Sequence, residues 1–460
     1  MDYDVLILGG GLIGCAVAYE LSKYNLNIAL IEKDYDIADD IALSNTSIVF
    51  NGMECGDSLT SQLEFMGNNM MEEVTQKFKV PFKQRPSIIV SEDEEFIDDL
   101  YKIGKEKQKD IKILTREELI DLQSDINKDY NKALYFENTG VVCPYDLALA
   151  YGEVAFDNNV NFKLEEEVLD IKKESKGFKV ITNKNKFTCK IVINTTPNEN
   201  YCIDNKKEKE KECNLNIRYV CINREANLDY SNLIFSVTRE KEHMLAIPTL
   251  NGETIGAMVT AKDIDNATVL EELKTIIPNI DNKYISTFYN NKYYDRPFFI
   301  DDSGIDIGYI KVSNKHYAIV TMAPAIAKII SETVINKIKC RKKKDFIDRR
   351  REYYRFRDLT NEERNEIIKL NPSYGKIICF CEKVTEGEII DAIRRPLGAR
   401  TLEGIKRRTG AAVGKCQGAQ CMNKILFILA RETNKPLTEI VKDSKNSIIL
   451  LNRIKEFDTM

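Results

Sequence analysis

Three glycines near the start of the chain have the spacing of a phosphate-binding turn. Gly9, Gly11 and Gly14 follow the apolar run 4–8 and lead into a stretch of helical character that begins at Cys15. In a G-x-G-x-x-G turn the first glycine permits a tight bend, the second leaves room for a pyrophosphate, and the third lets the helix pack closely on the sheet. The free N–H groups at the helix start then face the phosphates. This pattern predicts a dinucleotide site.

An acidic residue completes this pattern. A second apolar run, 27–31, ends on Glu32, which lies 18 residues after Gly14. In dinucleotide sites a carboxylate roughly 20 residues beyond the glycines binds the ribose hydroxyls. Strand, turn, helix, strand and acid occur in the required order, so we favour a nucleotide site over a plain βαβ unit. The chain has no second G-x-G-x-x-G, which indicates one dinucleotide.

Four of the twelve cysteines gather near the C-terminus. One residue separates Cys379 from Cys381, and four separate Cys416 from Cys421. Four thiolates from two loops can hold a [2Fe–2S] cluster. Zinc sites usually space their paired cysteines by about two to four residues, so zinc is the weaker alternative. Nearby basic residues are expected to offset the charge of the thiolates: Lys406, Arg407, Arg408 and Lys415.

Composition indicates a globular protein of several domains. The 460 residues exceed one ordinary core, so two or three domains are expected. The net charge of −5 gives no reason to expect nucleic acid. We find no apolar run long enough to cross a bilayer and no signal peptide, and we therefore expect a cytoplasmic protein. The eight scattered cysteines are expected to be small buried residues: Cys15, Cys55, Cys143, Cys189, Cys202, Cys213, Cys221 and Cys340.

The elements that must position these residues alternate in type. Helical patterns occupy 59–78, 92–108, 115–123, 145–157 and 323–336, and Ser91 and Thr115 are expected to cap the second and third of these. An antiparallel sheet is expected over 217–259, with a hairpin turn at Asn251-Gly252. Prolines at the entry of the strand 80–90 suggest a sheet edge. The order of elements predicts an α/β nucleotide domain interleaved with an antiparallel sheet that covers the substrate.

A basic segment, 339–372, interrupts this alternation. Lysine and arginine dominate its parts 339–344 and 349–357. A solvated linker is the main interpretation of such a charge run. A docking strip for an acidic partner is the alternative.

With both sites located, the chain resembles the FAD-dependent oxidoreductases of the anaerobic glycerol-3-phosphate dehydrogenase type. These combine a D-amino-acid-oxidase-like flavin domain with a bacterioferritin-associated-ferredoxin-like [2Fe–2S] domain. The resemblance covers nearly the whole chain and rests on these segments: 9–32, 139–145, 295–297, 323–327, 372–382, 385–389 and 415–421. It implies an FAD-binding Rossmann-like domain interleaved with an antiparallel substrate domain, plus a small, mainly helical [2Fe–2S] domain.

The resemblance also implies boundaries and site residues. It places the FAD-dependent oxidoreductase domain at 1–338, with substrate-covering inserts at about 80–140 and 203–300. The basic linker is 339–372 and the [2Fe–2S]-binding domain is 373–460. The implied FAD contacts are Gly9, Gly11, Gly14, Glu32, Asn45 and Thr46. Arg296 is the implied catalytic residue, and the implied cluster ligands are Cys379, Cys381, Cys416 and Cys421.

This sequence departs from the family pattern at the flavin-ring end. In the loop 45–52, Phe50 occupies the position of a family histidine. The strand-ending Asn-Ala-Ala-Gly is replaced by Asn194 and the three residues Thr195-Thr196-Pro197. The family's glycine-rich loop is missing before Thr321. The phosphate end of the site therefore matches the family, whereas the ring end does not.

Two functions follow from these features. The first is an FAD-dependent dehydrogenase resembling glycerol-3-phosphate dehydrogenase, which passes electrons from a small anionic hydroxy substrate through flavin and cluster to a second redox subunit. Arg296 would bind the substrate anion through its planar guanidinium. Only His243 and His316 could supply a histidine base, and His243 is more simply a structural residue. The alternative is an electron-transfer or scaffold subunit with a catalytically degenerate flavin domain.

Overall fold

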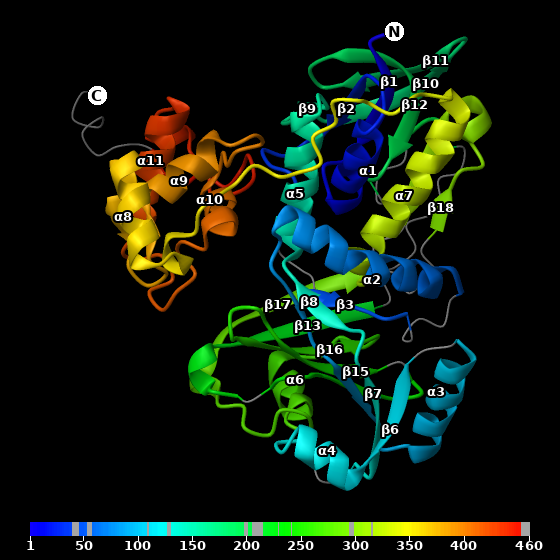
Figure 1. Ribbon diagram of the computed structural model, residues 1–460, viewed down its shortest axis with the longest axis vertical. Coiled ribbons are helices and arrows are strands. Elements are labelled where there is room, and N and C mark those ends of the chain that lie inside the picture. Colours follow the sequence, from blue (N-terminus) through cyan, green and yellow to red (C-terminus); the bar gives the residue numbers. More distant parts are fainter. Residues whose placement is uncertain are drawn as a thin grey trace.

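The computed structural model describes most of the chain. The described ranges are 1–38, 46–52, 58–107, 110–126, 130–196, 201–204, 215–228, 230–240, 242–293, 299–313 and 316–451. These residues form three parts: a sheet with helices packed against it, a second, antiparallel sheet, and a mainly helical C-terminal part beside them (Figure 1). This architecture confirms the fold class expected from the sequence.

The first sheet places the carboxyl ends of its parallel strands at one edge. Strand β1 pairs in parallel with β2 and with β12, and β12 pairs in parallel with β19. The strands of this sheet are β1 (Tyr3–Leu8), β2 (Ile28–Ile31), β9 (Asn161–Lys163), β10 (Val168–Glu174), β11 (Gly177–Thr182), β12 (Lys186–Asn194), β18 (Phe299–Asp301) and β19 (Tyr309–Ser313). Because β1 and β2 are almost entirely buried, their sequences are continuous apolar runs.

Four helices build the layer beside this sheet. They are α1 (Leu12–Ser22), α2 (Ser58–Phe78), α5 (Pro144–Asp157) and α7 (Ile319–Ile338). Helix α1 packs between α5 and α7, and α2 crosses α7 (Figure 1). By length and composition α7 could cross a membrane, which corrects the expectation that no such run exists. Most of its apolar window, 61%, is buried inside the protein, as in a core helix.

The antiparallel sheet combines two separate segments of the chain, which meet through one parallel strand pair, while its other strand pairs are antiparallel. Its order is β17-β13-β16-β15-β14-β5-β7-β6. These strands are β5 (Ser87–Val90), β6 (Ile111–Thr115), β7 (Lys132–Phe136), β13 (Leu215–Ile222), β14 (Leu233–Val237), β15 (His243–Pro248), β16 (Thr254–Thr260) and β17 (Ile285–Tyr293). The predicted hairpin turn joins β15 to β16, with Gly252 at φ +82°. The predicted edge strand 80–90 forms two strands: β4 (Phe82–Gln84) lies at the edge of a small sheet, as expected, whereas β5 lies between β14 and β7.

Smaller elements surround this sheet. The helices are α3 (Glu94–Glu106), α4 (Arg116–Leu122) and α6 (Asn266–Leu273), and a three-stranded sheet contains β3 (Ile48–Val49), β4 (Phe82–Gln84) and β8 (Gly140–Val142). Thr115 caps α4 with a full capping box, as predicted. The cap of α3 is Asp93, whose side chain accepts the Phe96 N–H, and not Ser91. An aspartate serves as well as serine at this position, and here it is the residue closer to the helix.

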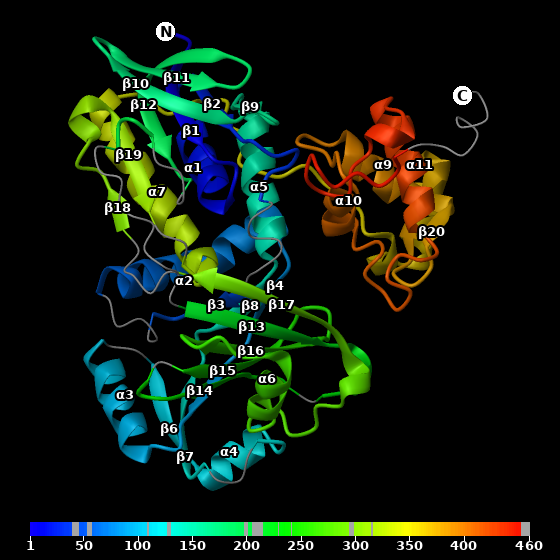
Figure 2. The ribbon, with the colours of Figure 1, turned by 180° about the vertical axis from the view of Figure 1, so that it is seen from behind.

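The C-terminal part has its own small core. Its elements are α8 (Asn361–Leu370), β20 (Ile377–Cys379), β21 (Val384–Thr385), α9 (Glu386–Arg394), α10 (Leu402–Thr409) and α11 (Met422–Thr433). Seen from behind, α10 lies toward α5, and β20 lies on the opposite side of this part (Figure 2). The cysteine-bearing strand therefore points away from the first sheet.

Candidate functional site

The glycine turn has the conformation that the spacing predicts. Gly9 adopts φ +96°, a backbone region that favours glycine. A Cβ on Gly14 would overlap the carbonyl oxygen of Gly9, so only glycine permits this approach of helix and turn. Gly11 is the N-cap of α1, and it supplies no capping side chain. The first turn of α1 also has no acidic residue, which leaves its N–H groups suited to an anion.

Glu32 lies directly beside this turn. One carboxylate oxygen accepts the Gly10 N–H at 2.6 Å, and the other accepts the Asp34 N–H at 2.9 Å. Each carboxylate oxygen can accept a further hydrogen bond. The carboxylate is therefore held at the ends of β1 and β2, where it could bind ribose hydroxyls.

Thr46 provides an independent sign of a ligand. Its side chain is buried, 1% exposed, and among the described residues its hydroxyl has no hydrogen-bond partner. A buried hydroxyl without a partner costs free energy unless a bound molecule or water satisfies it. Together with Glu32 and the glycine turn, Thr46 fits an FAD site. The predicted contact Asn45 lies outside the described residues.

Aromatic side chains pack around Phe50, at the position that the resemblance assigns to the flavin-ring end. Phe50 is 2% exposed, and its ring packs edge-on against Tyr317 at 5.4 Å and tilted against Phe235 at 6.3 Å. Its N–H donates to the hydroxyl of Thr321 in α7 at 3.0 Å. Helix α7 begins at Ile319, so Thr321 lies in its first turn. Phe50 is thus an apolar packing residue in a fixed position.

The threonines that replace the family's small residues support the glycine turn. The Thr195 hydroxyl donates to the Leu8 carbonyl at 2.8 Å, and the Thr196 hydroxyl donates to the Asn194 side chain at 2.5 Å. A Cβ on Gly9 would meet both threonine side chains. Thr195 and Thr196, which follow β12, therefore pack against the glycine turn. Pro197 and Arg296 both lie outside the described residues.

The four C-terminal cysteines come together in two pairs. The thiol of Cys416 lies within hydrogen-bonding reach of Cys381, and that of Cys421 within reach of Cys379. Backbone N–H groups of the turn after Cys416, led by that of Gln420, lower the pKa of its thiol. Burial, followed by the neighbouring Cys379, raises the pKa of Cys421 to about 11. Bound iron would lower it, because metal ligation favours the thiolate.

This arrangement fits a cluster better than a single ion. In the part of the chain that the structure describes, no three His, Cys, Asp or Glu side chains surround one metal position. Two cysteine pairs match the four-thiolate ligation of a [2Fe–2S] cluster. The sulfur of Cys416 also accepts backbone N–H groups, as cluster ligands do. The four cysteines predicted from their spacing are therefore the residues that would hold it.

Metal analysis tests this assignment. Anaerobically purified protein should contain iron and acid-labile sulfide in equal amounts, with two of each per chain at full loading. Zinc should be absent, because tetrahedral zinc needs four ligands around one centre. One zinc per chain without sulfide would contradict the cluster assignment.

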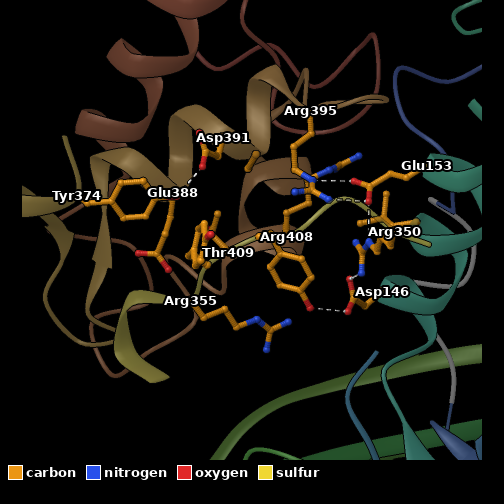
Figure 3. A pocket seen from close by; sticks show the side chains of 14 residues that line it. Asp146, Glu153, Arg350, Arg355, Tyr374, Glu388, Asp391, Arg395, Arg408 and Thr409 are labelled. Carbon is orange, nitrogen blue, oxygen red and sulfur yellow. Dashed lines mark hydrogen bonds and ion pairs between the residues drawn. The ribbon is translucent and has the colours of Figure 1, made fainter. Parts of the chain in front are cut away.

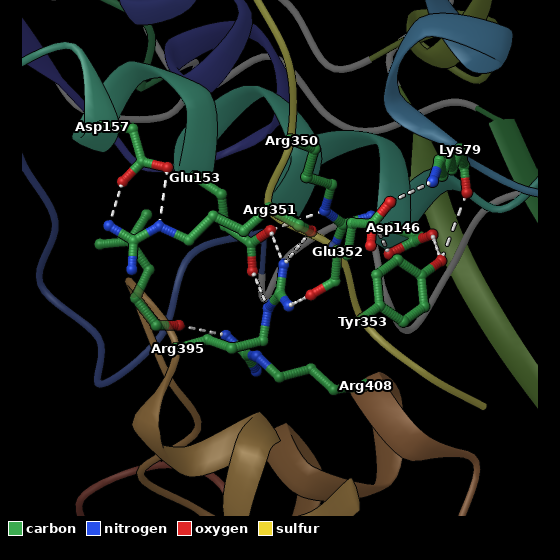
Figure 4. Close-up of polar contacts among 11 residues, drawn as sticks. Lys79, Asp146, Glu153, Asp157, Arg350, Arg351, Glu352, Tyr353, Arg395 and Arg408 are labelled. Carbon is green, nitrogen blue, oxygen red and sulfur yellow. Dashed lines mark hydrogen bonds and ion pairs between the residues drawn. The ribbon is translucent and has the colours of Figure 1, made fainter. Parts of the chain in front are cut away.

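A buried ion network joins the C-terminal part to the rest of the protein. Glu153 of α5 accepts hydrogen bonds from Arg350 at 2.6 Å and from Arg395, after α9, at 3.0 Å (Figures 3 and 4). Arg350 also contacts Asp146, which lies seven residues before Glu153 in α5, at 2.9 Å. All four side chains are at most 13% exposed. A cavity of only about 40 Å³ remains among them and their neighbours.

A second contact reaches the loop that follows Glu32. Arg408 of α10 binds both carboxylate oxygens of Asp36 and the hydroxyl of Tyr145 at 2.6 Å. A Cβ on Gly404, one turn earlier in α10, would approach the same carboxylate. The C-terminal part therefore docks beside the predicted ribose-binding acid.

These contacts correct two expectations about charge. Within the run 349–357, Arg350, Arg351 and Arg357 form ion pairs with Glu153, Asp157 and Glu382; Arg350 is 6% exposed and Arg351 57% exposed, so the run is partly buried against the protein and not wholly solvated. The basic residues near the cysteines likewise bind carboxylates: Lys406 binds Glu403, Arg407 binds Asp443, Arg408 binds Asp36 and Lys415 binds Glu225. Except for Lys406 and Glu403, which lie three residues apart in α10, these pairs join residues far apart along the chain, and no sequence pattern indicated them.

Comparisons with known proteins agree with this geometry. Residues 4–333 match the family described as FAD dependent oxidoreductase, and residues 377–431 match the BFD-like [2Fe-2S] binding domain. A "Glycerol 3-phosphate dehydrogenase" from Caloramator mitchellensis is 33% identical over 98% of this chain and 99% of its own length. A "Glycerol 3-phosphate oxidase" from Mycoplasma pneumoniae is 24% identical over 71% of this chain and 92% of its own length.

Solved structures share the fold of the first two parts. The dithionite-reduced L-alpha-glycerophosphate oxidase of Mycoplasma pneumoniae, with FAD bound, superposes with a TM-score of 0.67 at 22% identity. The match covers 76% of this chain and 99% of that one. The L-proline dehydrogenase of P. horikoshii gives a TM-score of 0.64 over 75% of this chain and 95% of its own. The chain therefore belongs to the FAD-dependent oxidoreductase family and carries a BFD-like [2Fe–2S] binding domain.

Proposed function

We propose that this protein is a cytoplasmic dehydrogenase for a small anionic hydroxy compound of the glycerol 3-phosphate type. Electrons would leave through the [2Fe–2S] domain to a second redox subunit. One observation carries this proposal: the same chain contains both sites. The glycine turn lies beside Glu32 and Thr46, and the C-terminal part holds the paired cysteines. The similarity to a glycerol 3-phosphate dehydrogenase over almost the full length supports it.

The chain's own residues have defined tasks in this proposal. Bound FAD would supply a hydride acceptor, which no amino-acid side chain can provide. The N–H groups at the start of α1 hold the pyrophosphate, and Glu32 holds the ribose. The buried aromatic residues Phe50 and Phe235 exclude water from the ring end. Arg296 binds the anionic group of the substrate.

Substitution of Arg296 tests the substrate assignment. In Arg296→Ala the substrate loses a bidentate charge-assisted contact, typically worth about 1.5–3 kcal/mol, so its apparent affinity should fall roughly 10- to 150-fold. Arg296→Lys should fall less far, because it retains the charge but not the planar fork. Anaerobic bleaching of the flavin against glycerol 3-phosphate and related hydroxy acids measures the effect. Arg341→Ala, at an exposed linker position, is the matched control. Equal affinity in Arg296→Ala and Arg341→Ala would contradict the assignment.

The altered ring end favours one alternative. Phe50 is apolar and buried against Tyr317, so it cannot accept a proton from a substrate hydroxyl. We therefore expect weak activity with glycerol 3-phosphate itself. If no hydroxy anion bleaches the flavin while dithionite reduces both centres, the protein is an electron-transfer or scaffold subunit. Bleaching by any such compound excludes that alternative.

A further inference from the structure

Large apolar side chains are exposed around the paired cysteines. Phe380, between Cys379 and Cys381, is 62% exposed, and Met422, next to Cys421, is 39% exposed. Val413, three residues before Cys416, is 41% exposed. We call Phe380, Val413 and Met422, with the exposed Lys383 and Lys424, the cysteine face. Clustered exposed apolar residues bordered by polar ones mark interaction sites.

The docking of the C-terminal part leaves this face open. Among the described residues, Arg395, after α9, and Arg408 of α10 make hydrogen bonds to the rest of the protein on the side toward α5. Strand β20, which leads into Phe380, lies on the opposite side from α5 (Figure 2). Beside the face, Lys415 pairs with Glu225, which belongs to another part of the chain. The apolar residues of the cysteine face are therefore not used for internal packing.

Two exposed lysines border the apolar residues of the cysteine face. Lys383 and Lys424 are exposed, and neither has an ion-pair partner among the residues that the structure describes. The ammonium group of Lys424 lies 5.5 Å from the centre of the Phe380 ring, so charge and apolar surface adjoin. Two carboxylates close in sequence to the cysteines are paired, since Glu382 binds Arg357 and Glu386 binds Lys376 and Arg431. A partner would meet unopposed lysines.

We propose that the cysteine face binds a small acidic one-electron carrier protein. The inference rests on the proposed function, which requires an electron acceptor, and it identifies the surface and the charge of that acceptor. In the complex one electron would pass from the reduced cluster to the oxidised centre of the carrier, without transfer of a proton or a group. Positive charge steers an acidic carrier to the face, and the apolar residues exclude water at its centre. Such contacts are small and transient, as this face would allow.

A binding experiment with a defined probe tests this surface. Fluorescently labelled flavodoxin, an acidic one-electron carrier, is titrated with the oxidised holoprotein at low salt, in the absence of any substrate. The double variant Lys383→Glu, Lys424→Glu should bind about tenfold more weakly or worse, because two attractions become repulsions. Phe380→Ala should also weaken binding about tenfold, as truncation of a central aromatic anchor does. Wild-type binding should weaken steeply as salt rises.

Matched controls lie in the segment beside α10, where Asp443 pairs with Arg407. Lys445 and Ile448 are exposed in the turns after α11, whereas Cys421 lies at the N-terminus of that helix. Lys445→Glu and Ile448→Ala should bind the probe like wild type. The visible spectrum of each variant confirms that the cluster is retained, so that lost binding reflects the surface.

Three outcomes would overturn the proposal. One is no saturable flavodoxin binding at low salt, or tighter binding of the basic protein cytochrome c. Another is equal weakening by the control variants. The third is self-association of the wild-type protein that Phe380→Ala abolishes in sedimentation, which would assign the face to a second copy of this chain. Because no substrate is present, failure of the proposed dehydrogenase activity would leave these measurements unaffected.

Discussion

Replacing Glu153 by glutamine should destabilise the docked protein by about 3–5 kcal/mol, the usual cost of removing one partner from a buried ion pair. The carboxylate is 3% exposed and binds two guanidinium groups, those of Arg350 and Arg395. A neutral amide cannot compensate two buried charges, and both arginines lose part of their hydrogen bonding. Urea titration followed by near-ultraviolet circular dichroism should show the lower midpoint. Limited proteolysis should cut the connecting segment faster.

The same helix provides the control. Asp157, one turn after Glu153, pairs with Arg351, whose side chain is 57% exposed. Asp157→Asn should cost less than Glu153→Gln, because Asp157 is buried but its partner Arg351 keeps contact with solvent. If both variants lose the same free energy of unfolding, burial of the ion pairs around Glu153 does not increase their contribution to stability. Replacing Glu153 and Arg395 together by Leu and Met, with Arg350 still paired to Asp146, should restore part of the loss, since each remaining buried charge keeps a partner.

The pH dependence of the network follows from the same carboxylate. Burial alone would raise the pKa of Glu153, but Arg350 and Arg395 outweigh it and lower the pKa below its ordinary value of 4.5. A carboxylate with a lowered folded-state pKa adds stability that is complete above the unfolded-state value and is lost as the pH falls through the folded-state value. The free energy of unfolding of the wild type should therefore fall to that of Glu153→Gln only below about pH 4.5.

Local patterns predicted the local structure well. The run from Tyr3 to Glu32 contains its own signals: two buried strands, a glycine turn and a helix that needs small residues against a sheet. Thr115 followed by Glu118 likewise specified a capping box within four residues. Such features are decided by neighbours along the chain, so composition and spacing are sufficient to find them.

The domain contact could not be predicted in this way. Asp36 and Arg408 are separated by 372 residues, and neither belongs to a periodic pattern. An arginine in a basic run has the same local sequence whether it is solvated or buried against a carboxylate on another element. Arg350 looked like part of a linker, yet it is 6% exposed. The pairing depends on complementary surfaces that exist only after both parts have folded.

The ring end lies between these two cases. The sequence shows Phe50 at the position where the family that it resembles has a histidine. It does not show which residues the Phe50 ring contacts. Its neighbours Phe235 and Tyr317 come from the antiparallel sheet and from the start of α7, which meet only in the folded protein. The sequence thus identified an altered position, and the structure supplied its environment.

Replacing Gly11 by valine should nearly abolish FAD binding without unfolding the protein. Gly9 needs its positive φ and Gly14 its close approach to the turn, so substitutions there disturb the fold itself. Gly11 differs, because its φ of −69° and ψ of −177° are accessible to any residue. A branched side chain at this N-cap would occupy the place of the pyrophosphate. Steric exclusion of that group should weaken FAD binding at least roughly 100-fold, or ~2.7 kcal/mol.

Gly11→Ala separates this effect from the loss of the helix cap. Alanine and valine are equally poor N-caps and should each cost about 1 kcal/mol of stability. They differ in bulk, so Gly11→Ala should retain more FAD than Gly11→Val while both show the same midpoint of thermal unfolding in the flavin-free form. The ratio of flavin to protein absorbance after gel filtration gives the retention, and the iron content should be unchanged. Full flavin in Gly11→Val would show that the pyrophosphate binds elsewhere, because no rearrangement of this turn leaves room for both.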